Sequence, residues 1–541
     1  MVAVARLIGG AGTGKTTELM RIIEQVVAKG VDPFSIGFCS FTRAARMEAS
    51  GRAAEKFNIV KDDLNRFGWF KTIHSIVYRQ LNVGSELLAG NAESREWFRE
   101  VFGEGVDVDP SEDLGEVSGR TQTGVVLGLW NCSRNRRTDF ESIWSLAIRC
   151  DSKIPDLEKC QEIVDRYEQR KTLDHRVDFV DILGRFAGYR FTFDGTIPTD
   201  PDGDCPPIPV WIFDEQQDTS RLLDSVCRRL VFEGGTSWCY LAGDPFQSIY
   251  GWNGAEGRLF MQWKADHEKI TGKSFRCPDS ILSLGERCIV NSEDYFDRKI
   301  APADHEGRID LMNSQSREWM RSLDPSQSVL LLARTNHLAT FFANLMNEEG
   351  IPWDSTKGSA SWLPPTKRND LRTLECLQKN TPIDFNEWRS VVSHLPVKGN
   401  FSRGVKTQWN ESSYRPENLM TNLEGISEWG ATDEMIQRIR SGDWSSMIEG
   451  GHRYQKAVGR FDVMDVLHPK IRIGTIHSVK GAEADRVVLM DSSTRQSRES
   501  ERFPAGLDEE RRLAYVGVTR ARKELIILRR MGAGHRMPIP V

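Results

Sequence analysis

The sequence predicts an α/β protein with parallel sheets. An apolar run at residues 2–8 passes through a glycine-rich loop into a segment whose apolar residues recur at helical spacing until Gly30. A second apolar run, 36–41, is again followed by a helix-compatible segment, 43–57. Because strands that alternate with helices form parallel sheets, this order indicates the fold class. The length of 541 residues allows several domains.

Further apolar runs of strand length occur along the rest of the chain. Two stretches between them differ in character: residues 81–177 read as mainly helical, and residues 380–465 are polar, dotted with tryptophan and poor in strand signals. Both are interpreted as insertions into α/β domains. The apolar runs lie at 210–213, 238–242, 329–333, 471–476, 486–490 and 525–528. The first insertion holds an acidic cluster, formed by Glu104, Asp107, Asp109, Glu112, Asp113 and Glu116.

The formal net charge is −5, from 72 Lys and Arg against 77 Asp and Glu, which on its face argues against a nucleic-acid partner. This average is misleading, because residues 511–541 carry eight Lys and Arg against one acid, Glu524, while the six acids of the acidic cluster alone more than account for the net charge of −5. No apolar run is long enough to span a membrane, and the first residues do not resemble a secretory signal, so a cytoplasmic, intracellular protein is expected. The ten cysteines lack metal-binding spacing and are expected to be reduced thiols.

A phosphate-binding loop is the first specific motif. Residues 9–16 (GGAGTGKT) fit the pattern G-x-x-x-x-G-K-[ST] between a strand and a helix, as its mechanism requires. Glycines let backbone N–H groups turn toward phosphate oxygens at the start of a helix. Lys15 is expected to neutralise the β- and γ-phosphates of ATP, and the Thr16 hydroxyl to bind Mg²⁺. The predicted ATP-binding residues of this loop are Gly10, Ala11, Gly12, Thr13, Gly14, Lys15, Thr16 and Thr17.

Two carboxylates follow the apolar run at residues 210–213. Asp214 is placed to hold Mg²⁺, and Glu215 to orient and deprotonate the attacking water. Such a pair is more often a solvated loop when it stands alone, but together with Lys15 it indicates a nucleotide hydrolase. Kinases, transporters and helicases share these motifs, so they leave open what the hydrolysis drives.

A longer series of motifs covers both α/β regions. The motifs are residues 41–45 (FTRAA), 72–75 (TIHS), 214–219 (DEQQDT), 243–252 (GDPFQSIYGW), 274–278 (SFRCP), 474–483 (GTIHSVKGAE) and 509–522 (EERRLAYVGVTRAR). In wording and order this series resembles the motifs of the UvrD/Rep-like group of superfamily 1 helicases.

The resemblance implies two RecA-like domains with ATP bound between them. The expected division is a first domain of residues 1–80 and 178–275 with the helical insertion 81–177, and a second domain of residues 276–379 and 466–541 with a reduced insertion, 380–465. In this scheme Arg276 and Arg520 act as arginine fingers on the γ-phosphate, which stabilise charge that develops in the transition state. The other roles that the resemblance implies are sensing of the γ-phosphate by Gln247, stacking on adenine by Phe275 and contact with the ribose by Glu483.

Residue chemistry also suggests a path for a single strand. Non-specific strand binding combines aromatic platforms with cations and hydroxyl groups along the backbone. Tyr250 and Trp252 lie close in sequence to Gln247 and are well placed to link base stacking to the state of the nucleotide. The remaining candidates for contact with DNA are Phe41, Thr42, His74, His477 and Lys480. Strand binding is expected to be modest, salt-sensitive and confined to a groove.

The resemblance therefore implies an ATP- and Mg²⁺-dependent single-stranded-DNA translocase and helicase with 3'-5' polarity, acting at single/double-strand junctions in DNA repair or replication. Three alternatives stay open. The enzyme could unwind RNA or move in the opposite direction, it could displace proteins without unwinding, or it could be the helicase subunit of a larger nuclease or defence complex. The sequence does not identify a loading partner or a pathway.

Overall fold

Short apolar runs form the strands of two six-stranded sheets, and helices from the intervening segments pack on them. The computed structural model describes residues 2–40, 43–88, 91–103, 121–151, 153–358, 360–410, 420–530 and 535–541. No described helix is long and apolar enough to cross a membrane. All ten cysteines are free thiols and most of them are buried, as expected.

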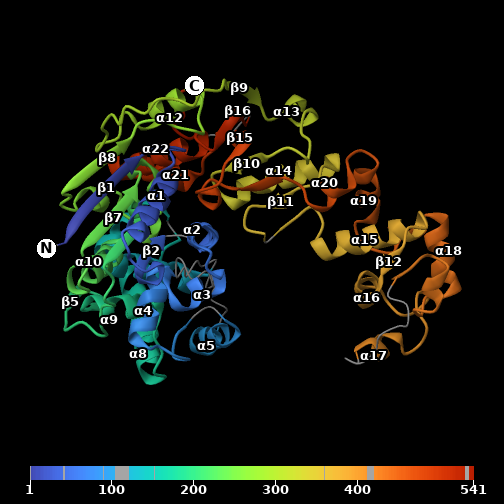
Figure 1. The fold of residues 1–541 in the computed structure, drawn as a ribbon, viewed down its shortest axis with the longest axis horizontal. Coiled ribbons are helices and arrows are strands. Elements are labelled where there is room, and N and C mark those ends of the chain that lie inside the picture. Colours follow the sequence, from blue (N-terminus) through green and yellow to red (C-terminus); the bar gives the residue numbers. More distant parts are fainter. Residues whose placement is uncertain are drawn as a thin grey trace. The chain divides into compact units, whose positions relative to one another are not determined.

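The first sheet has the strand order β3-β2-β6-β7-β1-β8, and its registered pairs are all parallel (Figure 1). β2 and β6 are buried along their whole length, as strands covered on both faces are. Leu19 and Ile23 of helix α1 share a core with Phe38 and Ile212 of these strands. The strands are β1 (Ala3–Gly9), β2 (Ile36–Ser40), β3 (Trp69–Lys71), β6 (Val210–Asp214), β7 (Trp238–Gly243) and β8 (His267–Thr271). Its helices are α1 (Lys15–Ala28), α2 (Arg43–Phe57), α3 (Lys61–Phe67), α4 (Ile73–Leu81), α10 (Arg221–Glu233) and α11 (Arg258–Met261).

The second sheet has the order β11-β14-β10-β15-β16-β9, with β10 parallel to both β14 and β15. The predicted α/β class with parallel sheets is therefore confirmed. The strands are β9 (Arg308–Asn313), β10 (Val329–Ala333), β11 (Asp354–Ser355), β14 (Ile471–Thr475), β15 (Ala484–Met490) and β16 (Ala521–Arg529). The helices near them in sequence are α13 (Glu318–Arg321), α14 (Asn336–Glu349) and α15 (Pro365–Gln378).

The described parts of both predicted insertions are mainly helical. The first contains α5 (Ala92–Phe102), α6 (Gln122–Arg136), α7 (Phe140–Cys150) and α8 (Leu157–Leu173), and it is followed by α9 (Phe179–Ala187) and the hairpin of β4 (Tyr189–Thr192) and β5 (Gly195–Pro198). The acidic cluster lies outside the described residues. The second contains β12 (Ile383–Asp384), α16 (Phe385–His394), α17 (Val405–Asn410), β13 (Met420–Thr421), α18 (Asp433–Ser441), α19 (Gly451–Val458) and α20 (Val463–Leu467), and it buries Trp388, Trp429 and Trp444.

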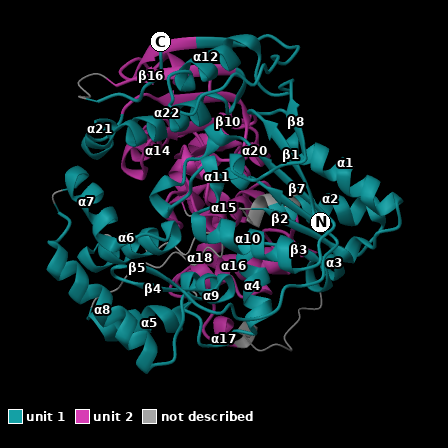
Figure 2. Cartoon of the chain, turned by 90° about the vertical axis from the view of Figure 1, so that its left-hand side faces the viewer, with its two compact units in different colours: residues 1–309, 493–523, 533–541 teal, residues 310–492, 524–532 magenta. Residues whose placement is uncertain are grey.

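The chain forms two compact units that cut across the predicted four-part division (Figure 2). Unit 1 comprises Met1–Ile309, Ser493–Lys523 and Ala533–Val541, and unit 2 comprises Asp310–Ser492 and Glu524–Gly532. Helices α12 (Asp279–Ile289), α21 (Arg495–Glu501) and α22 (Pro504–Val518) thus belong to the same unit as the phosphate loop. The four-part division stays a prediction.

Candidate nucleotide and strand site

The carboxyl ends of three neighbouring strands meet at one edge of the first sheet. In the parallel register Ile8 of β1 lies opposite Gly243 of β7, and Phe213 of β6 lies opposite Leu241 of β7. The glycine loop after β1, Asp214 at the end of β6 and the loop after β7 therefore come together. Ligands bind at this edge of open α/β sheets.

The phosphate loop has the backbone that its glycines predict. Gly12 and Gly14 have φ angles of 67° and 75°, which are left-handed conformations that suit glycine. Helix α1 begins directly after Gly14, at Lys15. The Lys15 ammonium is 9% exposed and donates hydrogen bonds to the carbonyl oxygens of Gly9 and Gly10, both at 3.2 Å. These contacts hold the cation at the loop, where phosphate oxygens can replace the carbonyls.

The carboxylates at the end of β6 face this loop. The Thr16 hydroxyl donates to Asp214 Oδ2 at 2.8 Å, and Asp214 is buried. Burial, and then the neighbouring Glu215 carboxylate, raise the pKa of Asp214 to about 6. A hydroxyl and a carboxylate at this distance are oxygen ligands that Mg²⁺ prefers, and a bound cation would offset the cost of burying the charge. The residues present therefore fit Mg²⁺ and a nucleoside triphosphate.

Glu215 has an unusual backbone conformation for a residue with a side chain. Its φ is 55°, and its carboxylate accepts a hydrogen bond from Gln217 Nε2 at 2.5 Å. Left-handed non-glycine residues occur often at functional sites, where the surrounding structure compensates their cost. Gln217 Oε1 in turn accepts from the backbone N–H of Asp244 at 3.0 Å, so one amide links the strand ends of β6 and β7.

Gln247 and Arg520 lie in direct contact, although 273 positions separate them in the sequence. Arg520 Nη2 donates to Gln247 Oε1 at 3.2 Å, and Gln247 Nε2 donates to Asp244 Oδ2 at 2.8 Å. The amide is thereby oriented with its oxygen toward the guanidinium. The structure thus brings together two residues that the resemblance assigned to the γ-phosphate.

Residues 274–276 cover the phosphate loop. The Ser274 hydroxyl donates to Ala11 O and the Phe275 N–H donates to Gly12 O, both at 2.8 Å. A Cβ added at Gly12 would lie 2.3 Å from the Cβ of Arg276, so the close approach itself requires glycine at this position. The Phe275 side chain is 66% exposed beside the loop, which leaves its ring open for stacking.

Two residues that sequence reasoning missed complete this network. The Tyr515 hydroxyl accepts from the Ala11 N–H and donates to Asp244 Oδ2, both at 3.1 Å, and burial holds its pKa well above the usual range. The Arg298 guanidinium, fully buried, pairs with Asp244 and Glu286 at 2.5 Å. Tyr515 lies inside the quoted motif 509–522, but no motif marks Arg298.

The aromatic residues of the loop after β7 differ in exposure. Trp252 is 43% exposed in the turn η4 (Gly251–Asn253), whereas Tyr250 is 7% exposed and packs edge-on against it at 6.2 Å. The Trp252 ring is therefore partly open to solvent, and Tyr250 packs against it. Arg136 at the end of α6 holds this loop by donating to Gly251 O at 2.8 Å.

The remaining predicted site residues lie in different places. His74 lies edge-on to Phe179, and burial lowers the pKa of His74 to about 4, so its ring is neutral at pH 7. Thr17 is exposed on the first turn of α1. Phe41 and Thr42 lie outside the described residues. His477, Lys480 and Glu483 belong to unit 2, in and after the turn η7 (His477–Val479), and Glu483 is exposed.

Comparison with known proteins agrees with the motifs. Residues 3–268 match the family model described as UvrD/REP helicase N-terminal domain, and residues 460–530 match the UvrD-like helicase C-terminal domain. The chain belongs to the UvrD/Rep-like helicase family. Its two parallel sheets accordingly represent the two RecA-like folds of that family.

Several curated members of the family align with most of the chain. A DNA helicase II of Haemophilus influenzae is 22% identical over 632 aligned residues, which cover 96% of this chain and 81% of the relative. The ATP-dependent DNA helicase PcrA of Bacillus subtilis is 20% identical, with 96% of this chain and 80% of the relative covered. DNA helicase II of Escherichia coli is also 20% identical, with coverages of 96% and 81%.

Proposed function

We propose that this protein is an ATP- and Mg²⁺-dependent DNA helicase that moves 3' to 5' along a single strand. One observation carries the ATPase part of the proposal. A phosphate-binding lysine, a Thr16–Asp214 pair, Glu215 and the Gln247–Arg520 contact lie around the same sheet edge within unit 1. The relatives named as DNA helicases support duplex DNA as the substrate.

Each residue has a chemical task in this proposal. Lys15 exchanges its loop carbonyls for the β- and γ-phosphate oxygens of ATP, and Thr16 and Asp214 hold Mg²⁺, which neutralises phosphate charge when bound. Glu215 accepts the proton of the attacking water. Arg276 and Arg520 stabilise the charge that builds on the transferring phosphoryl group. Gln247 contacts the γ-phosphate and thereby couples its presence to the conformation of the loop that ends in Trp252.

Movement along DNA follows from coupling this site to the strand. Bases stack on Trp252, and His477 and Lys480 of unit 2 contact the strand separately, so closure on ATP and relaxation after hydrolysis change the distance between two grips. Glu483 binds the ribose of the same nucleotide. Phe275 stacks on the adenine, and His74 acts as a neutral hydrogen-bonding group.

A tailed-duplex unwinding assay tests the proposal. Substrates with a 3' tail, a 5' tail or an RNA tail are compared with ATP, beside the Lys15→Ala protein. We expect ATP-dependent unwinding of the 3'-tailed DNA and none with Lys15→Ala. Unwinding from the 5' tail would reverse the polarity, and strand-stimulated ATPase without unwinding would favour a translocase that displaces proteins.

A further inference from the structure

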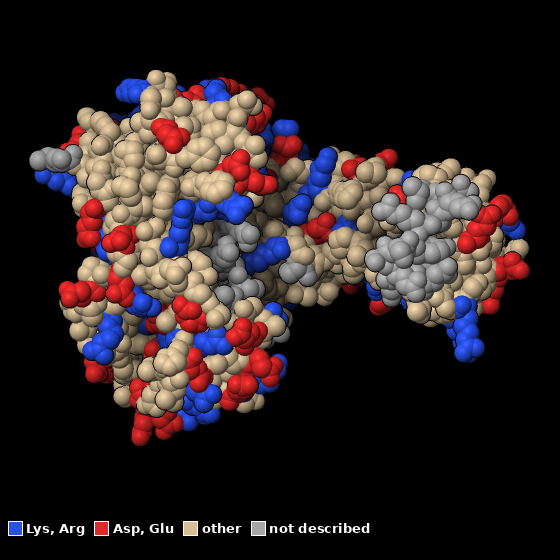
Figure 3. Space-filling model, turned by 60° about the horizontal axis from the view of Figure 1, so that its bottom comes forward, with Lys and Arg blue, Asp and Glu red and all other residues tan. Residues whose placement is uncertain are grey.

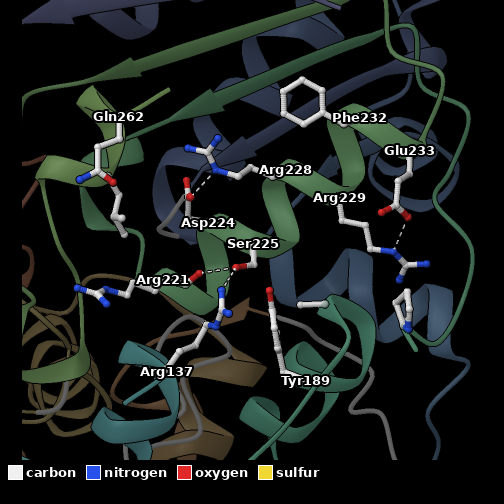
Figure 4. Close-up of a pocket in the computed structure, with 13 residues that line it drawn as sticks. Arg137, Tyr189, Arg221, Asp224, Ser225, Arg228, Arg229, Phe232, Glu233 and Gln262 are labelled. Carbon is white, nitrogen blue, oxygen red and sulfur yellow. Dashed lines mark hydrogen bonds and ion pairs between the residues drawn. The ribbon is translucent and has the colours of Figure 1, made fainter. Parts of the chain in front are cut away.

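A cavity of unit 1 is lined by residues that do not belong to the phosphate loop. It has a volume of about 710 Å³ and lies between α10, the start of β4 and the end of α6 (Figure 4). Its lining combines aromatic side chains, Tyr189 and Phe232, with four arginines. This volume is in the range of pockets that hold small ligands. The four arginines are Arg137, Arg221, Arg228 and Arg229.

Three of these arginines are paired with carboxylates. Arg221 pairs with Glu256 at 2.8 Å, Arg228 with Asp224 at 2.7 Å, and Arg229 with Glu233 at 2.9 Å. Arg229 also donates to the carbonyl oxygens of Asp202 and Gly203, so it stabilises the adjoining loop. The positive charge that these three arginines bring to the cavity is therefore partly compensated by the carboxylates.

Arg137 differs from these three. Within the described chain, no carboxylate lies within ion-pair distance of its guanidinium, which donates to Ser225 Oγ at 3.0 Å and stacks on the Tyr189 ring at 3.7 Å. Its Nε is buried without a hydrogen-bond partner. Ring and hydroxyl hold the planar group in a fixed orientation in the cavity wall (Figure 4), and the hydroxyl uses one of the five N–H donors of the guanidinium.

The backbone of Arg137 is also costly. It ends helix α6 with φ 54° and ψ 46°, the left-handed conformation that helices usually assign to glycine or asparagine at this position. Glycine would adopt this conformation without strain. An arginine therefore stands where the backbone favours a residue with no side chain.

Residues next to the cavity lining form hydrogen bonds with the loop that carries Trp252 or lie directly after it. Arg136, the residue before Arg137, donates to Gly251 O at 2.8 Å. Glu256, the partner of Arg221, follows the same loop, and its N–H donates to Thr219 O at 3.1 Å. The helix end that carries Arg137 is therefore in direct contact, through Arg136, with the loop that carries Trp252. On the face drawn in Figure 3, basic and acidic side chains are interspersed.

We propose that this cavity binds one nucleotide unit of the single strand that passes Trp252, with Arg137 on the phosphodiester and Phe232 beside the base. Arginine forks match phosphate oxygens, and exposed aromatic rings accept bases of any sequence. Phe232 is 55% exposed and already stacks on Trp263 at 5.9 Å, so its ring is held in place. This inference rests on the proposed strand binding and extends it to a site outside the recognised motifs.

The test replaces Arg137 with glycine, which removes the guanidinium and also relieves the backbone. Fluorescence anisotropy of labelled oligothymidylate at several salt concentrations measures affinity and its salt dependence for the full-length protein. We expect Arg137→Gly to weaken binding about three- to tenfold and to reduce the slope of log K against log salt by about 0.7, the value for one phosphate contact on a single strand. Arg137→Lys keeps the charge and should recover most of the slope.

Two controls separate this role from a structural one. Asn82→Gly changes another left-handed helix end, at φ 48°, without removing a cation, and Arg99→Ala removes an exposed arginine outside the cavity. Both should leave affinity and slope unchanged. An unchanged slope in Arg137→Gly, with or without a lower melting temperature, would overturn the proposal.

Free phosphate is the rival source of the same chemistry. If calorimetry shows that inorganic phosphate binds the wild type but not Arg137→Gly, while both proteins bind oligothymidylate with the same affinity and salt slope, the cavity binds free phosphate and the strand assignment is wrong. If the wild type does not bind oligothymidylate at all, the proposed helicase function fails first. If the wild type binds oligothymidylate and Arg137→Gly binds it with the same affinity and salt slope, only the proposed cavity site is rejected.

Discussion

At the scale of single residues, Arg520 shows how the site is prepared for an anion. Its side chain is 1% exposed, and burial together with the neighbouring Arg276 guanidinium lowers the pKa of Arg520 to about 10. The group is still protonated at neutral pH, but its charge is costly. A phosphoryl group beside two guanidiniums would relieve this cost, which supports the proposed role of Arg520.

Arg520→Ala should leave ATP binding largely intact and lower turnover about a thousandfold or more, because the guanidinium acts on charge that develops in the transition state. Binding of a fluorescent ATP analogue and steady-state hydrolysis with saturating DNA measure the two effects. Arg522→Ala, an exposed arginine two positions away, is the matched control and should keep its turnover. Normal hydrolysis by Arg520→Ala would argue against the proposed site.

His74 makes stability depend on pH. Because its pKa in the folded protein is about 4, below the ordinary value of 6.5, the unfolded chain binds a proton between these values that the folded chain does not. Stability should therefore fall as the pH drops below 6.5, by about 1 to 2 kcal/mol between pH 7 and pH 5. Melting temperatures of wild type and His74→Gln at both pH values test this.

Between pH 7 and pH 5, the melting temperature of His74→Gln should decrease less than that of the wild type. His175→Gln, at an exposed histidine, should decrease like the wild type. Equal decreases in all three proteins would mean that other groups cause the pH dependence.

The residues of the phosphate loop could be predicted from the sequence because they are contiguous and their spacing is set by one ligand. Lys15, Thr16 and Asp214 lie where this pattern places them. Arg298 and Tyr515 could not be predicted in the same way. They contact Asp244 from positions 54 and 271 residues away in the sequence. Such contacts depend on tertiary packing, which the spacing of residues within a motif does not predict.

At the scale of elements, the loop after β7 is held by helices from two distant parts of the chain. Arg136 of α6 donates to Gly251 O, and Arg512 of α22 donates to Ser248 O at 3.0 Å. The exposed ring of Trp252 is thus carried by a loop that both the first insertion and the C-terminal helix position. A change in either helix would alter the proposed contact between this ring and a base.

Trp252→Ala should lower the strand-stimulated ATPase about tenfold and the basal ATPase much less, because base stacking of about 1 to 3 kcal/mol is lost while the phosphate site stays intact. ATPase rates with and without oligothymidylate measure the ratio. Trp238→Ala is a suitable control, since Trp238 is 38% exposed at the amino end of β7, at the opposite edge of the sheet. Equal losses in both rates would assign Trp252 a packing role.

At the scale of the whole molecule, the chain passes between the two units at four points: after residues 309, 492, 523 and 532. The predicted domain boundary at 275/276 is based on the motifs, whereas the division into two compact units is based on packing. Helices α12 and α22 pack against each other, and both belong to unit 1. Strand β16 begins directly after Arg520 and continues into the second sheet. The backbone therefore connects a proposed γ-phosphate contact to unit 2 through a strand.

If unit 2 contributes to nucleotide binding, Glu483→Ala should raise the KM for ATP about five- to tenfold with a small effect on kcat, because a hydrogen bond to a charged group is lost in both ground and transition states. Steady-state ATPase with saturating DNA measures this. Glu428→Ala, at another exposed acid of unit 2, should leave both constants unchanged. An unchanged KM in Glu483→Ala would place nucleotide binding in unit 1 alone.

The contact between Ala11 and Tyr515 spans 504 positions, and it has a consequence during synthesis on the ribosome. The phosphate loop is translated long before the hydroxyl that meets its backbone and before the proposed finger Arg520. A nascent chain thus carries the loop long before it carries the groups proposed to complete hydrolysis. If these groups complete hydrolysis as proposed, an unfinished chain that carries the loop alone does not consume ATP.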